Sequence, residues 1–140
     1  MATSSFRLSK EASSAAADAV TRLLDGGRLR LYSDSPQPAT ADAPVPGRAI
    51  LLVDLALGSP AFEPAVAGNA EATEIKSSRA TGRGTAEWFR AVTSGGRAIY
   101  DGSVGEDNSG ADCELGSTMI SPGVEVLVSS MIYTQPKARA

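Results

Sequence analysis

The sequence predicts a sandwich or barrel-like β fold of about seven or eight short strands that follow one α-helix. The first observation is the stretch 84–104, in which two β-rich runs are joined by Gly95-Gly96. A Gly-Gly pair supplies the positive φ that a tight hairpin turn needs. The second observation is the high content of turn residues, because most of the 14 glycines and 8 prolines lie between apolar runs.

Length and composition predict a single folded domain. A chain of 140 residues, 42% hydrophobic and 21% charged, can bury a core without disulfides or metal. Aromatic residues make up only 5%, so we expect a core built mostly from Val, Ile, Leu and Ala. We expect an N-terminal arm over residues 1–8, one domain over 9–134 and a loose, basic tail over 135–140.

The helix is predicted over residues 9–25. Ser9 can cap it, and Gly26-Gly27 follows at the position where a left-handed residue commonly ends a helix. Between them, small and apolar residues recur at spacings of three and four. These residues are Ala12, Ala16, Ala19, Val20, Leu23 and Leu24. An alanine-rich stripe of this kind predicts a helix that packs closely against the sheet.

A clean alternation over residues 28–33 predicts a strand with Leu29 and Leu31 on its core face. The residues expected on its outward face are Arg28, Arg30 and Tyr32. Residues 35–47 then carry four prolines and show no periodicity, so they predict a long surface loop. A loop of this length in a small domain is either functional or held in place by a partner.

Residues 49–57 are the most apolar run of the chain. Both faces are apolar apart from Asp54, which predicts a central strand covered on two sides. Phe62 follows a Ser-Pro turn and is expected to close the edge of the core. Weaker strands are predicted near residues 71–76 and 113–120.

The final strand is predicted over residues 124–133 and is apolar on both faces. One face carries Val124, Val126, Val128 and Ile132, and the other carries Leu127, Met131 and Tyr133. Such a strand needs a cover on each side. The cover is the N-terminal helix, a second copy of the chain or another protein.

Charge and composition exclude several classes of function. The net charge of −3 and the absence of a basic field argue against nucleic-acid binding. No apolar run approaches the length of a membrane span or a signal peptide, so we expect no membrane partner and synthesis in a cytoplasm. The sequence has no histidine, which excludes Ser-His-Asp and Cys-His catalysis and the usual zinc sites.

The isolated motifs do not predict an active site. The Gly82-Arg83-Gly84 run precedes a strand, whereas a dinucleotide-binding fingerprint follows a strand and opens a helix. Glu87 and Asp101 have the residue types of a glycosidase pair, but carboxylates on adjacent strands are commonly solvated surface groups. Cys113 is the single cysteine, and we interpret it as a small, partly buried side chain.

The densest acidic cluster lies in the polar stretch 101–112. Its members are Asp101, Glu106, Asp107, Asn108 and Asp112. Close oxygen ligands on a glycine-rich loop are suited to calcium, but the spacing differs from the twelve-residue calcium loop. We therefore interpret the cluster as a solvent-exposed loop at the end of a hairpin, and we predict no metal and no cofactor.

A set of ordered motifs gives the chain a resemblance to a known family. The motifs are Leu29-Arg30-Leu31-Tyr32-Ser33, the stretch 37–42, Leu51-Leu52-Val53-Asp54-Leu55, Ser59-Pro60-Ala61-Phe62, the stretch 80–90, and Asp101-Gly102-Ser103-Val104-Gly105 with Gly110-Ala111-Asp112. In these motifs the chain resembles small virion proteins of tailed bacteriophages and prophages over nearly its whole length. Its length and pattern are similar to those of capsid cement (decoration) proteins, including that of a Bordetella bacteriophage.

The resemblance implies an all-β, jelly-roll-like β-sandwich of about seven to eight short antiparallel strands behind the helix. It also implies a non-enzymatic homodimer on the outside of the capsid, with the major capsid protein as its partner. The family has no catalytic motif, so no catalytic residue is transferred. The candidate contact residues lie in the arm, the proline-rich loop and the final strand: Phe6, Arg7, Gln37, Pro38, Val126, Val128, Met131 and Tyr133.

Two other functions remain open. The chain could be a carbohydrate-binding β-sandwich of a phage tail or fibre, with Trp88 or Tyr100 as the stacking platform beside the acidic loop. It could also be a small enzyme, although the lack of histidine makes this the weakest alternative. The exposure of Trp88 separates the first two functions, because a sugar platform must be accessible and a scaffold tryptophan is buried.

Overall fold

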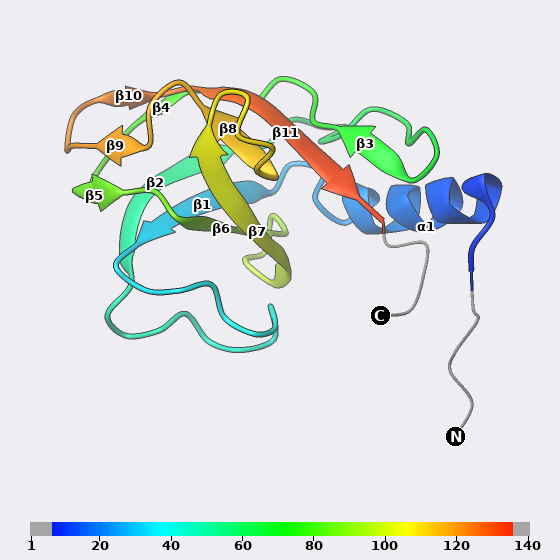
Figure 1. Ribbon diagram of the computed structural model, residues 1–140, viewed down its shortest axis with the longest axis horizontal. Coiled ribbons are helices and arrows are strands. Elements are labelled where there is room, and N and C mark those ends of the chain that lie inside the picture. Colours follow the sequence, from blue (N-terminus) through cyan, green and yellow to red (C-terminus); the bar gives the residue numbers. More distant parts are fainter. Residues whose placement is uncertain (1–6, 136–140) are drawn as a thin grey trace.

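The computed structural model describes residues 7–135, which form one helix and eleven strands (Figure 1). The elements in chain order are α1 (Lys10–Arg22), β1 (Arg28–Ser33), β2 (Ile50–Ala56), β3 (Asn69–Glu71), β4 (Ser78–Arg79), β5 (Gly84–Thr85), β6 (Trp88–Val92), β7 (Ala98–Glu106), β8 (Cys113–Leu115), β9 (Met119–Ile120), β10 (Glu125–Val126) and β11 (Val128–Thr134). The predicted all-β sandwich with one leading helix is confirmed. The helix in the described part of the chain is too short to cross a bilayer.

Seven of the strands form one sheet in the order β2-β1-β6-β7-β8-β11-β3. The sheet bends so that β8 and β11 lie above β1 and β6, and the core fills the space between the two layers (Figure 1). Its pairs are antiparallel except for β7 and β8, which run parallel over residues 104–106. Two further pairs, β10-β4 and β5-β9, form small separate sheets at the end of the molecule opposite α1 (Figure 1). The expectation of purely antiparallel strands therefore fails at a single pair.

The helix begins at the predicted cap, but it ends at Arg22 rather than at residue 25. The Ser9 hydroxyl accepts a hydrogen bond from the Ala12 amide at 3.0 Å, which caps the first turn. Gly26, at φ 68°, turns the chain away after Leu24. The face of α1 that packs near β3 and β11 carries Ser13, Ala17 and Thr21. The predicted stripe was therefore on the wrong face, because Ala12, Ala19 and Leu23 are exposed and only Leu24, which follows the helix, is buried. The helix therefore covers one end of the final strand.

The core face of β1 is the one that its alternation predicts. Leu29 and Leu31 are completely buried, and their cross-strand neighbours on β6 are Ala91 and Phe89. The predicted hairpin is also confirmed: β6 pairs with β7, and Gly96 has a positive φ of 89° in the turn between them. Gly102 on β7 lies against the Phe89 ring, where a side chain would collide with it. These residues make the hairpin the centre of the sheet.

The prediction that residues 49–57 form a central strand is wrong, because β2 is an outer strand of the sheet. Its free edge is covered instead by an irregular segment: the amides of Thr81 and Gly82 donate to the Leu52 carbonyl, and Lys76 donates to Ala56. The other outer strand, β3, is covered in the same way by residues 61–66. The apolar composition of β2 thus reflects this cover rather than a central position.

The final strand is interrupted at Leu127, which separates β10 from β11. Strand β11 lies between β8 and β3, so both of its edges are paired within the chain. Val126 and Met131 point into the core and are buried. The strand predicted near 113–120 corresponds to the shorter elements β8 and β9, and Phe62 closes the core beside β3 as expected. The strand predicted over 71–76 is wrong, because β3 overlaps it only at Glu71 and residues 73–76 are irregular.

Candidate functional site

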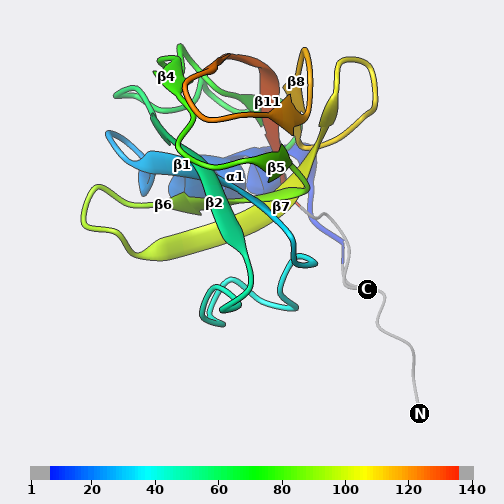
Figure 2. The same ribbon diagram turned by 90° about the vertical axis from the view of Figure 1, so that its left-hand side faces the viewer.

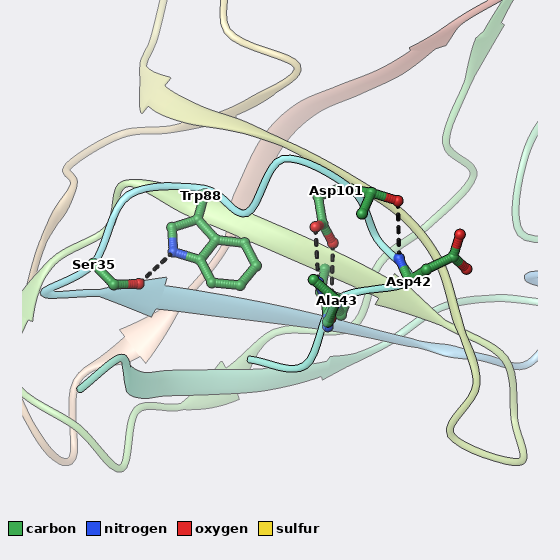
Figure 3. Close-up of polar contacts among 7 residues, drawn as sticks. Ser35, Asp42, Ala43, Trp88 and Asp101 are labelled. Atoms are coloured by element: carbon green, nitrogen blue, oxygen red, sulfur yellow. Dashed lines mark hydrogen bonds and ion pairs between the residues drawn. The ribbon is translucent and has the colours of Figure 1, made fainter. Parts of the chain in front are cut away.

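The proline-rich loop connects β1 to β2 and folds back over the outer face of β1, β6 and β7 (Figure 2). Because Ser33 pairs with Ile50, the loop leaves and re-enters the sheet at adjacent positions. Two hydrogen bonds from the Asp42 and Ala43 amides to Thr40 build a turn within it. Ser35 and Ala43 bring the loop against the sheet (Figure 3). The loop is therefore a structured cover, and we call it the loop cover.

Trp88 lies beneath the loop cover and is fully buried. Its ring stacks on Tyr32 at a centroid distance of 4.6 Å, and the Arg90 guanidinium lies 5.6 Å from its centroid. The indole N–H donates to the Ser35 hydroxyl at 3.3 Å (Figure 3). Burial raises the pKa of the Tyr32 hydroxyl. Tyr32 lies on the outward face as its alternation predicts, but it is buried because the loop cover encloses this part of the face.

A buried ion pair fixes the middle of the loop cover. Arg90 donates from Nε and Nη2 to the two carboxylate oxygens of Asp101 at 2.7 and 2.9 Å. Its remaining Nη1 donates to the Ala43 carbonyl at 2.7 Å. The two side chains are only 7% and 3% exposed, and the hydrogen bond with Asp101 raises the pKa of Arg90. Arg90 thus joins the sheet, Asp101 and the loop in one contact.

The outer face continues into a more exposed charge network. Asp54 on β2 accepts from Arg28 at 2.7 Å and from Arg30 at 3.3 Å. All three side chains are about one-third to nearly one-half exposed, so we expect only a small contribution to stability. The network marks where the loop cover ends and solvent begins.

Glu87 and Asp101 do not form a glycosidase-like pair. Asp101 is buried in the ion pair with Arg90, and Glu87 accepts a hydrogen bond from the Asp34 amide at 3.1 Å. A general acid and a nucleophile must both face the scissile bond. The two carboxylates instead have separate structural partners.

The acidic loop between β7 and β8 folds around its own carboxylates. Asp112 accepts hydrogen bonds from the amide and the hydroxyl of Ser103 at 3.0 and 3.1 Å. Glu114 accepts from the amides of Asn108 and Gly110. Among residues 7–135, no group of three or more carboxylate or thiol side chains is arranged to hold a metal ion. The carboxylates therefore act as acceptors that shape the turn.

Strands β9 and β10 lie at the end of the molecule opposite α1 (Figure 1), and apolar side chains in and beside them are exposed. Met119, Val124 and Leu127 are 78%, 50% and 64% exposed, and we call them the end patch. They surround a hollow of about 240 Å³ whose wall includes Ile120 and Val126. Apolar side chains gathered around a hollow are typical of surfaces that bind another protein.

A groove of about 710 Å³ follows the outer face of β11. Its walls are residues 63–71 on one side and residues 110–114 on the other. Four carboxylates line it, and no lysine or arginine of the described residues does. These carboxylates belong to Glu63, Glu71, Asp112 and Glu114. We call this feature the acidic groove.

The structure does not bring the predicted contact residues together on one surface. Val126 and Met131 are buried core residues, so they offer no surface to a partner, and this part of the interface prediction needs correction. Val128, Tyr133 and Pro38 are half-buried, whereas Arg7 and Gln37 are exposed. Phe6 lies outside the described residues, as do most of the predicted arm and tail. The sequence signal was the apolar character of residues 124–133, which could not separate core from surface.

Two buried groups below the acidic loop do not form an accessible site. Cys113 is fully buried, and burial, together with Asp112 and Glu114, raises the pKa of its thiol to about 12. Among the described residues the Tyr100 hydroxyl is buried without a hydrogen-bond partner, and burial raises its pKa as well. Tyr100 packs edge-on against Phe89 and Tyr133. Tyr100 is therefore a core residue rather than a sugar platform.

The end patch and the acidic groove were both missed from the sequence. Met119 and Leu127 lie in short apolar runs that resemble strands, so the sequence pattern does not show that their side chains are exposed. Glu63, Glu71 and Glu114 are far apart in the sequence, and only the pairing of β3 and β8 with β11 brings them to one groove.

Comparisons with protein-family models, with curated proteins and with solved structures found no match to this chain. The resemblance to phage virion proteins therefore stays a prediction.

Proposed function

We propose that the chain is a non-enzymatic structural protein of a phage virion that binds the outside of the major capsid protein shell and stabilises it. The burial of Trp88 beneath the loop cover carries this proposal. It favours a stiff scaffold over a carbohydrate-binding module of a tail or fibre, because the only tryptophan has no free face for a sugar. The ordered motifs shared with small virion proteins support the same conclusion.

A cement protein acts through surfaces that become buried on assembly. The end patch supplies apolar side chains for such a contact, and the loop cover presents its proline-rich outer side on a fixed base. Many weak contacts of this type add up around a shell because each bound copy bridges neighbouring subunits. In this proposal the protein functions as a homodimer at the virion surface after synthesis in the host cytoplasm.

Binding to emptied capsids tests the proposal. The wild-type chain should co-sediment with the capsids and raise their melting temperature. Replacing Met119 and Leu127 with Ser should weaken binding by about tenfold or more, because apolar anchors dominate such contacts. The matched control is Leu23→Ser, which removes another leucine that is more than half exposed, from the C-terminal end of α1. A wild-type chain that neither binds nor stabilises the capsids would contradict the proposal.

The contributions of the predicted N-terminal arm and of the loop cover to capsid binding are tested separately. Removal of residues 2–8, or replacement of residues 37–42 by a Gly-Ser sequence, should reduce capsid binding if these segments touch the shell. Unchanged binding by both variants would exclude these two segments as capsid contacts and leave the end patch as the contact surface. A change in Trp88 fluorescence on addition of a sugar or calcium would instead favour the carbohydrate-binding function.

A further inference from the structure

We propose that the acidic groove binds the segment 136–140 of a second copy of this chain, so that two copies exchange these basic segments reciprocally. The inference specifies how the homodimer of the proposed function is built and rests on it to that extent. It does not depend on the shell, because the association is measured without capsids.

The charge of the groove lacks a partner within the described residues. Glu63 and Glu71 are exposed, and neither forms an ion pair or accepts a side-chain hydrogen bond there. The Glu63 amide donates to the Glu71 carbonyl at 2.8 Å, which holds the two residues side by side. Adjacent carboxylates repel each other, and a cationic partner removes this repulsion. The groove is therefore suited to a basic ligand.

The shape of the groove is suited to an extended segment. Ser130, Ile132 and Thr134 line its floor, and alternate residues of a strand point to the same face. From the first to the last of them the floor is about 13 Å long. Ile132 and Ala111 give this floor an apolar component between the charged walls. An extended chain of four or five residues fills such a groove.

The segment 136–140 has the matching chemistry. Its sequence is Pro-Lys-Ala-Arg-Ala, in which Lys137 and Arg139 are the only charged residues. In an extended chain two residues at this spacing point to the same side, about 7 Å apart. Both cations can then face the carboxylates of one wall, while Ala138 faces the opposite side. The pattern complements Glu63 and Glu71.

The geometry favours a second copy over the same chain. The Gln135 amide donates to the Gly68 carbonyl at 2.8 Å, so the chain is fixed at the end of the groove up to this residue. Folding back over β11 would need a four-residue turn. That turn would contain Lys137 and take it away from the carboxylates. A segment that arrives from another copy can place both cations in the groove.

Complementary charge reversal provides the test. The first variant carries Glu63→Lys and Glu71→Lys, and the second carries Lys137→Glu and Arg139→Glu. Each variant alone places like charges in both contacts of the dimer, so its dimer dissociation constant should rise by about tenfold or more. An equimolar mixture restores opposite charges in both contacts of the heterodimer. Sedimentation velocity and native mass spectrometry should then detect a heterodimer as stable as the wild-type homodimer.

The control variant carries Glu106→Lys and Asp107→Lys, which reverses two exposed carboxylates outside the groove. It should dimerise like the wild type, and circular dichroism should show that all variants fold. A monomeric wild type, dimers that persist in both reversal variants, or a mixture that forms no heterodimer would each overturn the inference. If the mixed variants form the heterodimer but the wild-type chain does not bind capsids, only the proposed function is contradicted.

Discussion

Arg90 connects three parts of the molecule through one guanidinium group. Its three nitrogens donate hydrogen bonds to a carboxylate and a backbone carbonyl, and the same group lies over the Trp88 ring. Burial makes this contact sensitive to the loss of either charge, because an unpaired charge in the interior is strongly destabilising. Asp101 is therefore required structurally even though it resembles a catalytic carboxylate in the sequence.

Asp101→Asn should lower the free energy of unfolding by about 3–5 kcal/mol, because it leaves the Arg90 charge buried without its counter-ion. The control is Asp107→Asn in the exposed loop, which should change the free energy of unfolding by less than about 0.5 kcal/mol. Urea denaturation followed by Trp88 fluorescence measures both. Equal stability of the two variants would show that the ion pair is not a major stabilising contact.

Gly27→Ala should lower the free energy of unfolding by about 1–3 kcal/mol through overpacking. A methyl group at this position would overlap the Val92 carbonyl oxygen, and backbone cannot move aside as a side chain can. Gly47→Ala is the matched control, because no atom lies within 4 Å of its added methyl group. That control should be neutral or slightly stabilising. Thermal denaturation of both variants tests the difference.

The sequence left the exposure of Trp88 open and assigned Tyr32 to solvent, whereas the structure buries both side chains. Trp88 stacks on Tyr32 beneath the loop cover, so its burial depends on the same loop. Tyr32 lies on the face that alternation assigns to solvent, and this face is closed only because the loop cover returns over it. Local periodicity carries no information about a loop that folds back from further along the chain.

At the scale of elements, the loop cover replaces a layer of secondary structure. It shields the outer face of the β1–β6–β7 region through Ser35 and Ala43, where other sandwiches place a strand or a helix. Prolines reduce the freedom of the unfolded loop, so its ordering costs less conformational entropy. The loop is thus part of the fold as well as a candidate contact surface.

Replacing residues 37–47 by a short Gly-rich turn should expose Trp88 without unfolding the sheet. Ser33 and Ile50 are already paired, so a short turn can join β1 to β2. The emission of Trp88 should shift to longer wavelength, and acrylamide should quench it more efficiently. As a control, the same Gly-rich sequence inserted after Gly95, in an exposed turn, should leave the Trp88 emission unchanged. An unshifted spectrum in the shortened variant would mean that the loop does not shield the ring.

Helix α1 and the β6–β7 hairpin could be predicted because their signals are local. A capping serine and a following glycine define the first, although its buried face carries Ser13, Ala17 and Thr21 rather than the predicted stripe. A Gly-Gly turn defines the second. The position of β2 could not be predicted, since a covered outer strand and a central strand have the same apolar composition. The break at Leu127 was missed for a similar reason: the residue continues an apolar run while its side chain is exposed.

At the scale of the whole molecule, the core contains several groups that ionise only at high pH. Burial raises the pKa of Tyr32, Tyr100, Tyr133 and Cys113, the last to about 12. The unfolded chain releases these protons at lower pH than the folded chain does. Folding stability is therefore unaffected by them below pH 9.0, the ordinary pKa of the thiol, and falls as pH rises toward 12.

The free energy of unfolding should decrease steadily between about pH 9 and about pH 12, by up to about 1.4 kcal/mol per pH unit for each such group. Tyr100→Phe should reduce this loss because it removes one of the titrating groups. It should also preserve or raise stability at neutral pH, since the Tyr100 hydroxyl is buried without a partner. Urea denaturation of both proteins across this range provides the measurement. Parallel pH profiles would show that Tyr100 is not one of the responsible groups.

The covered outer strands have a consequence for the behaviour of the protein at high concentration. Irregular segments hydrogen-bond to the free sides of β2 and β3, so neither offers an open row of amides and carbonyls to a neighbouring molecule. Sheets with open rims tend to join rim to rim and grow into fibres. At high concentration, pairing between the edge strands β2 and β3 of neighbouring copies is therefore suppressed. Association of the copies then depends on side-chain contacts of limited size.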